Sequence, residues 1–112
     1  MPKQATRTYS RITSHAAALL GKQIKIARKE SKMTAQDLAD RAGISRGLLQ
    51  RVEKGNLKCQ VGAVFEVATL VGIKLFDADE SSLIARIRQA DDKIALIPKH
   101  IHSSKKVVAD DF

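Results

Sequence analysis

The chain has 112 residues, of which 44% are hydrophobic and 29% charged, so it is long enough for one compact domain with short tails and too short for a multidomain enzyme. With no Trp, one Tyr and three Phe, its core is expected to be aliphatic and to pack through helix faces. No segment reaches the roughly 18 uncharged apolar residues of a membrane span. The first eleven residues are polar, unlike a signal peptide, so we expect a cytoplasmic location.

The positive charge is concentrated in the first half of the chain. Residues 1–60 carry 13 Lys and Arg against 4 Asp and Glu, a net of +9, whereas residues 61–112 carry 7 against 8, a net of −1. A surplus of this size attracts polyanions such as nucleic acid. Composition alone also allows a solvated surface that is kept in solution by its charge.

Three helices are predicted in the basic half, after a mobile basic arm over residues 1–12. Ser14 is the expected N-cap of the first helix, in which Leu20 and Ile24 have helical spacing. Thr34 begins the second helix, with Asp37 in a capping box, and Gly43 ends it. The third helix extends from Ser45 to Lys54, with Leu48, Leu49 and Val52 forming one apolar stripe.

Three further elements are expected after Lys54. A fourth helix covers residues 60–71, and the alternation from Ile73 to Asp77 indicates a short strand. An amphipathic helix over about residues 80–97 presents Leu83, Ile87, Ala90, Ile94 and Ile97 at 4,3,4,3 spacing. This row either closes the core of the domain, forms a dimer contact or docks a partner. The boundaries that we expect are therefore a domain at 13–77, a C-terminal helix at 78–98 and a mobile tail at 99–112.

The second and third helices satisfy the requirements of a helix-turn-helix. Ala39 is small where the two helices must cross, and Gly43 allows the left-handed backbone conformation of the turn. The remaining positions that must fill the crossing are all apolar: Leu38, Ala42, Ile44, Leu49 and Val52. A chance match at all seven positions is rare, which makes the motif specific.

The stretch from Leu20 to Phe76, above all Thr34 to Gly55, resembles the XRE family of Cro-like and lambda-repressor-like DNA-binding domains. The resemblance covers about half of the chain and implies an all-α, five-helix fold. Within the family, HipB-type antitoxins are the most similar, because Gly72 to Asp77 follows the fourth helix where those proteins place a short strand that pairs across a dimer.

The resemblance also implies residue roles. The third helix would enter the major groove and read bases with Arg46, Gly47, Gln50 and Arg51. Gly47 has no side chain where family members usually read a base, so close backbone approach or Gln50 takes that place. The implied phosphate contacts are Thr34, Gln36, Ser45, Lys54, Asn56 and Lys58. Ala35 stands where relatives carry Gln, and that contact is assigned to Gln36. Arg28 and Glu53 stand at positions of a buried ion pair and, like Ala39 and Gly43, are structural.

The implied function is that of a homodimeric repressor that binds a palindromic operator in double-stranded DNA and regulates its own genes. The resemblance to HipB-type proteins adds a HipA-type kinase toxin as a partner, which Phe112 would contact. The alternative is a stand-alone phage-type or metabolic repressor, in which the C-terminal helix serves only dimerisation. An interaction adaptor that binds no DNA is a third possibility. A terminal residue such as Phe112 is most often simply a frayed end of the chain.

No residues of the sequence indicate catalysis or metal binding. His15, His100 and His102 lack carboxylate or cysteine partners at ligand spacing, and Cys59 has no neighbouring His. Cys59 is interpreted as a free thiol, and a single cysteine fits a reducing compartment. We therefore expect no enzyme activity, no cofactor, no metal and no membrane association.

Overall fold

The computed structural model describes residues 8–101, and the chain divides into two units, Met1–Asp77 and Ala78–Phe112. The first unit contains α1 (Arg11–Glu30), α2 (Ala35–Ala42), α3 (Arg46–Glu53), α4 (Val61–Leu70) and a 3₁₀ turn at Leu75–Asp77. The second contains α5 (Glu80–Leu96). The described residues hold five α-helices and no strand, which confirms the expected all-α fold.

Helix α1 begins at Arg11, earlier than the sequence predicted. The Oγ of Ser10 accepts a hydrogen bond from the backbone N–H of Thr13 at 3.3 Å, so Ser10 is the N-cap. The N–H of Ser14, the expected cap, instead donates to the carbonyl of Ser10 at 3.2 Å and already belongs to the helix. Residues 11 and 12 are therefore helical rather than part of a basic arm.

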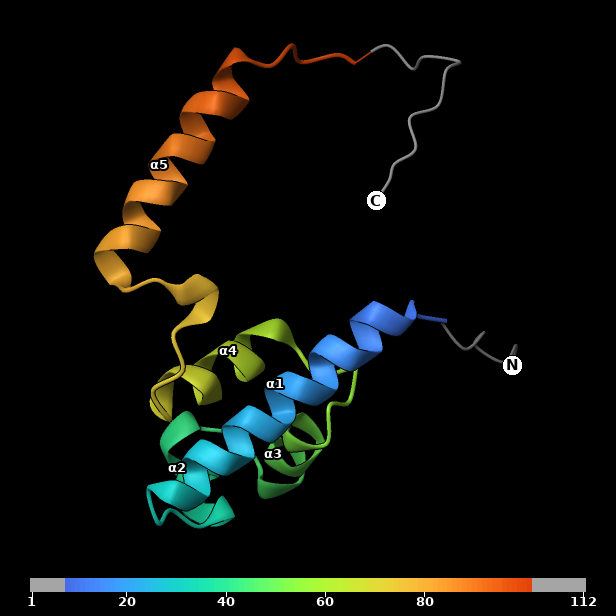
Figure 1. Cartoon of the computed structure of the whole chain (residues 1–112), viewed down its shortest axis with the longest axis vertical. Coiled ribbons are helices and arrows are strands. Elements are labelled where there is room, and N and C mark those ends of the chain that lie inside the picture. Colours follow the sequence, from blue (N-terminus) through green and yellow to red (C-terminus); the bar gives the residue numbers. More distant parts are fainter. Residues whose placement is uncertain (1–7, 102–112) are drawn as a thin grey trace. The chain divides into compact units, whose positions relative to one another are not determined.

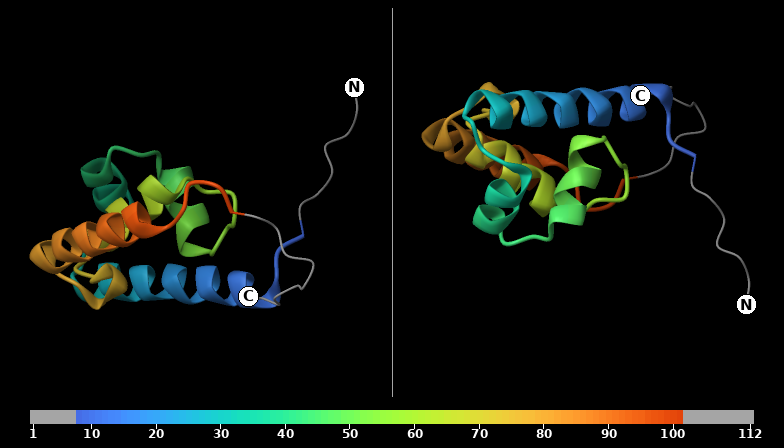
Figure 2. Two further views of the ribbon diagram at one scale, coloured as in Figure 1. Left: turned by 90° about the horizontal axis from the view of Figure 1, so that it is seen from above. Right: turned by 90° about the horizontal axis from the view of Figure 1, so that it is seen from below.

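The core of the first unit receives side chains from all four of its helices. Its buried members are Ile24 of α1, Leu38 and Ala39 of α2, Leu49 and Val52 of α3, and Val67 and Ala68 of α4. Helix α2 contacts both α3 and α4, and α1 contacts α3. The two opposite views in Figure 2 agree that α2, α3 and α4 lie on one side of α1, the longest helix in Figure 1.

Helix α1 approaches the C-terminal end of α3 so closely that the contact requires glycine. A Cβ added to Gly21 would lie 2.6 Å from the backbone oxygens of Val52 and Glu53. Gly55, which has φ +78°, meets α1 in the same way, because its added Cβ would lie 2.8 Å from the Cα of Ala18. These two contacts fix the end of α3 against α1.

The strand predicted at 73–77 is wrong. Phe76 and Asp77 have φ of 59° and 52°, which an extended strand does not allow, and the N–H of Asp77 donates to the carbonyl of Lys74. The alternation of apolar and polar residues therefore marks a turn. The turn directs the ring of Phe76 against the ring of Phe65, with centroids 6.4 Å apart in an edge-to-face arrangement.

Asp79 is the N-cap of helix α5, and its side chain accepts from the N–H of Ser82 at 2.9 Å; Ile97 is the C-cap. The hydrogen bonds from the N–H of Ser82 and from the hydroxyl of Ser81 lower the pKa of Asp79 below its usual value. None of the residues of α5 is buried. The core of the first unit and the partly buried residues that pack against it all precede residue 78.

Candidate nucleic-acid interface

The turn between α2 and α3 is held by backbone geometry and by caps on both helices. Thr34 and Asp37 form a reciprocal capping box: the Thr34 N–H donates to the Asp37 carboxylate at 3.1 Å, and the Asp37 N–H donates to the Thr34 hydroxyl at 3.0 Å. Gly43 has φ +70°, and the N–H of Ile44 donates to the carbonyl of Ala39 at 3.0 Å. These interactions set the angle at which α3 leaves the turn.

Helix α3 has one buried face and one exposed face. Leu49, Val52 and Glu53 are buried, and Ser45 caps the helix by accepting from the N–H of Leu48 at 3.0 Å. The exposed face carries all four residues that were assigned to base reading: Arg46, Gly47, Gln50 and Arg51. Residues three or four positions apart lie on the same side of a helix, and the pairs 46/50, 47/50 and 47/51 have these spacings, so these residues form one polar surface.

Gly47 leaves space that the side chain of Arg51 partly fills. A Cβ added to Gly47 would lie 3.7 Å from Nη1 of Arg51 and 4.0 Å from the Oγ of Ser45. The guanidinium of Arg51 therefore reaches back over the first turn of α3. The sequence predicts that Gln50 or close approach of the backbone takes the place of the missing side chain, and the structure adds Arg51 as a side chain near that position.

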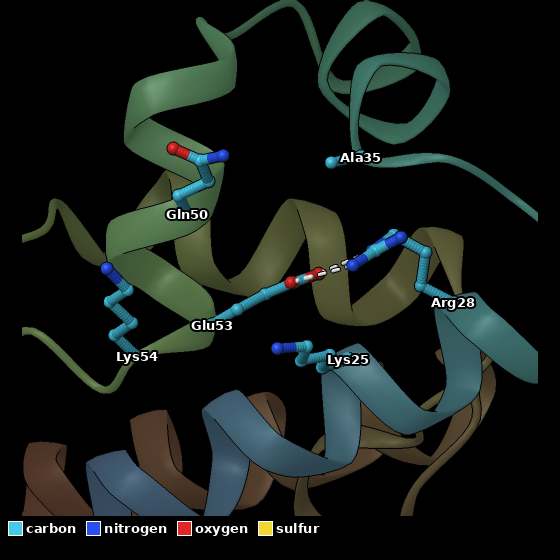
Figure 3. Close-up of a pocket in the computed structure, with 6 residues that line it drawn as sticks. All are labelled: Lys25, Arg28, Ala35, Gln50, Glu53 and Lys54. Carbon is cyan, nitrogen blue, oxygen red and sulfur yellow. Dashed lines mark hydrogen bonds and ion pairs between the residues drawn. The ribbon is translucent and has the colours of Figure 1, made fainter.

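Arg28 and Glu53 form a buried, two-point ion pair between α1 and α3 (Figure 3). The Arg28 Nε donates to one carboxylate oxygen of Glu53 at 2.7 Å, and Nη2 donates to the other at 3.0 Å. Nη1 donates to the carbonyl of Met33 at 2.9 Å, so the guanidinium also holds the chain that enters α2. The hydrogen bonds and charge of Glu53 raise the pKa of Arg28 above its ordinary value, although burial opposes the shift.

Several of the expected phosphate ligands already have partners inside the first unit. The hydroxyl oxygens of Thr34 and Ser45 accept backbone N–H groups as caps. The Thr34 hydroxyl also hydrogen-bonds with the Asp37 carboxylate, whereas the cap of α3 leaves the hydroxyl hydrogen of Ser45 for an outside acceptor. The amide of Gln36 donates to Asp40 at 2.8 Å, and the side chain of Asn56 accepts from the N–H of Lys58 at 2.7 Å. Lys54 and Lys58 are both exposed.

Sequence reasoning missed Lys25. This residue lines a pocket of about 240 Å³ that borders α3 on one side and reaches the start of α2; the lining residues are Lys25, Arg28, Ala35, Gln50, Glu53 and Lys54 (Figure 3). Lys25 precedes Arg28 by one helical turn, and that spacing is the signal that would have found it. Lys25 and Lys54 therefore border the same hollow as Ala35, the first residue of α2.

A second pocket, of about 480 Å³, borders α3 next to Arg51 and the start of α4. Its lining residues are Leu48, Arg51, Asn56, Lys58, Cys59 and Gln60. Gln60 is the N-cap of α4, but its side chain makes no capping hydrogen bond. The first backbone N–H groups of α4 therefore receive no hydrogen bond from this side chain. The exposed surface of α3 thus has a cationic hollow at Gln50 and another at Arg51.

The described residues show neither a metal site nor a membrane helix. No group of three His, Cys, Asp or Glu side chains in residues 8–101 is arranged to hold a metal ion. No helix in this part of the chain has the length and apolar character needed to cross a bilayer. Cys59 is half-buried, and His15 and His100 are exposed, whereas His102 and Phe112 lie outside the described residues.

The capped helix α2, the turn with Gly43 in the left-handed backbone conformation and the exposed cationic helix α3 together form the helix-turn-helix of a DNA-binding protein. The chain matches the sequence profile of the helix-turn-helix domain over residues 19–79, which is more than half of its length, and it belongs to that family. No curated protein and no solved structure matches the chain.

Proposed function

We propose that the protein is a sequence-specific repressor that inserts α3 into the major groove of operator DNA. The observation that carries this proposal is the polar surface of α3, which is free of core contacts and is bordered by two cationic hollows. A recognition helix in the major groove has a phosphate backbone on each of its sides. The two hollows are where those backbones would lie.

Arg46 and Arg51 are the proposed base readers. A guanidinium donates two parallel hydrogen bonds to O6 and N7 of guanine, so each arginine favours a guanine in the half-site. The side-chain amide of Gln50 can likewise form two hydrogen bonds, with N6 and N7 of adenine. Because Arg51 lies over Gly47, it is expected to read the base that a longer side chain at position 47 would have reached.

Phosphate contacts position the helix and supply affinity. Lys25, Lys54 and the start of α2 would bind one strand, and Asn56, Lys58 and the start of α4 would bind the other. The hydroxyls of Thr34 and Ser45 complete the set, together with Gln36. None of these contacts carries sequence information, so their loss should weaken binding to any duplex.

One module of this size makes too few base contacts for specific affinity. We therefore propose a homodimer that binds a palindromic operator, with two copies of α3 about 34 Å apart on one face of the duplex. Occupying promoter DNA would then repress transcription.

In vitro selection tests this proposal. The full chain is incubated with a random duplex library, and bound sequences are recovered and sequenced over several rounds. The expected product is an inverted repeat that contains guanines, with half-site centres about 10 base pairs apart. Recovery of unenriched sequence would contradict the proposal and favour an interaction adaptor.

A narrower proposal is that the repressor is the antitoxin of a HipBA-like module and also binds a HipA-type kinase. It rests on the resemblance of residues 20–76 to HipB-type proteins, and the strand that strengthened this resemblance is not formed. Affinity purification of the full chain from its native cell tests it. A kinase-fold protein recovered in stoichiometric amount would support the antitoxin role, and its absence would favour a stand-alone repressor.

A further inference from the structure

Helix α5 carries an apolar face for which the second unit itself provides no cover. Ile87, Ile94 and Ile97 are 58%, 65% and 50% exposed, and no residue of α5 is buried. A single helix of 17 residues is only marginally stable in water unless its apolar face packs against something. The face therefore requires an occupant.

The spacing of the face is that of a coiled coil. Leu83, Ile87, Ala90, Ile94 and Ile97 repeat at 4,3,4,3, which places Ile87 and Ile94 at a positions and Leu83, Ala90 and Ile97 at d positions. Both a residues are isoleucine and the first d residue, Leu83, is leucine, the combination that favours two strands in parallel coiled coils. Two further large apolar residues lie outside this row: Ile84 is 46% exposed and falls at an e position beside it, and Leu96 is 85% exposed and falls at an outer c position.

We infer that α5 of a second copy of this chain covers this apolar face, and that the two helices are parallel. This inference rests on the proposed function, because reading a palindrome requires two chains. In this heptad, Arg86 and Lys93 are the g residues and Asp91 is an e residue. Parallel pairing brings each g residue near the e residue five positions later in the partner, so Arg86 faces Asp91 of the other copy on both sides of the seam.

Antiparallel pairing is disfavoured by the same charges. It places g residues against g residues, and both g residues of α5 are basic. The register with the most overlap would bring Arg86 of one copy to Lys93 of the other, twice in each dimer. Charge complementarity therefore selects the parallel arrangement.

The first test measures the oligomeric state of the full chain by sedimentation equilibrium without DNA. We expect a dimer for the wild type, and at least a tenfold weaker dimer for Ile87→Asp and for Ile94→Asp, because each variant buries two carboxylates in the seam. Leu96→Asp is the matched control, since it makes the same change on the outer side, and it should remain dimeric. Circular dichroism monitors the fold of each variant. A monomeric wild type, or a dimer that Ile94→Asp leaves unchanged, would overturn the inference.

The second test determines the orientation by charge exchange. In the parallel dimer Arg86→Glu and Asp91→Lys each weaken association, and the double variant restores it because the opposite charges meet again. In an antiparallel dimer Arg86→Glu would strengthen association by facing Lys93. Strengthening, or no effect from either single variant, would refute the parallel pairing.

Failure of this inference is distinguishable from failure of the proposed function. If the seam variants remain dimeric while the wild type selects an inverted repeat, then the dimer uses another surface and the repressor proposal stands. If α5 forms the dimer but selection enriches nothing, then the interface stands and the repressor proposal fails.

Discussion

At the scale of single residues, Arg28 depends on Glu53 because both side chains are removed from water. Their residues are 7% and 8% exposed. Replacing Glu53 with Gln leaves a buried guanidinium without a counter-charge, which costs about 3–5 kcal/mol in comparable proteins. We expect Glu53→Gln to lower the free energy of unfolding by that amount, as measured by urea denaturation.

The matched variant for this experiment removes both charges. Arg28→Met combined with Glu53→Met replaces the ion pair with apolar side chains, so no uncompensated charge is buried. The double variant should be more stable than Glu53→Gln even though it also loses the hydrogen bond to the Met33 carbonyl. A double variant less stable than the single one would show that the hydrogen bonds, rather than the charge, dominate.

The two arginines that we propose as base readers give a prediction about binding. Arg46→Ala and Arg51→Ala should each weaken binding to the selected operator by about 1–3 kcal/mol, with much smaller effects on unrelated duplex. Fluorescence anisotropy with both duplexes measures the two losses. Arg88, an exposed arginine of α5 outside the apolar seam, is the control, and Arg88→Ala should leave both affinities unchanged. Equal losses on both duplexes would mean that Arg46 and Arg51 contact only phosphates.

At the scale of the elements, the turn between α2 and α3 depends on the conformation of Gly43 rather than on available space. An added Cβ at Gly43 would meet nothing within 4 Å, but its φ of +70° is unfavourable for other residues. Gly43→Ala should therefore destabilise the first unit by about 1–2 kcal/mol in urea denaturation. Gly62, in the first turn of α4, also has an open Cβ position, and there alanine should stabilise by about 0.5–1 kcal/mol. Equal effects of the two substitutions would refute the assignment of strain to Gly43.

The cap of α2 makes stability depend on pH. The backbone N–H of Thr34, followed by its hydroxyl, holds the pKa of Asp37 below its usual value. A lowered folded-state pKa stabilises the protein above the unfolded pKa of about 4, and this stabilisation is lost as the pH falls through the folded value. The excess unfolding free energy of wild type over Asp37→Asn, from urea titrations, should shrink below about pH 4. A constant difference from pH 7 to pH 3 would contradict the role of the charge.

Local signals predicted the elements well where a cap or a glycine marks the end. Thr34, Gly43 and Ser45 act on backbone groups within four residues, so the ends of α2 and the start of α3 can be predicted from the sequence. Two serines compete at the start of α1, and the sequence cannot choose between them. At residues 73–77 the alternating pattern of a strand fits equally well with a turn that brings Phe76 to Phe65.

The site was predictable where it follows the helical repeat of α3 and not where it depends on packing between helices. The sequence placed Arg46, Gln50 and Arg51 on one side of α3 because their spacing determines it. Lys25 joins the site only because α1 lies against α3, a contact that requires Gly21 and Gly55. Helix α4 is apolar nearly all round, so its pattern did not reveal that Val61 would be 63% exposed while Val67 is buried.

At the scale of the whole molecule, the charge asymmetry predicts which lysines determine the salt dependence of DNA binding. Each phosphate contact contributes about 0.9 to the slope of log K against log salt concentration. Lys25→Ala and Lys54→Ala should therefore each reduce the slope by about 0.9 for every bound chain, on operator and unrelated duplex alike. Lys99→Ala removes the same charge from the acidic half of the chain and should leave the slope unchanged. Anisotropy titrations from low to moderate salt measure all four slopes, and equal reductions for the three variants would show that net charge, rather than the hollows beside α3, binds the phosphates.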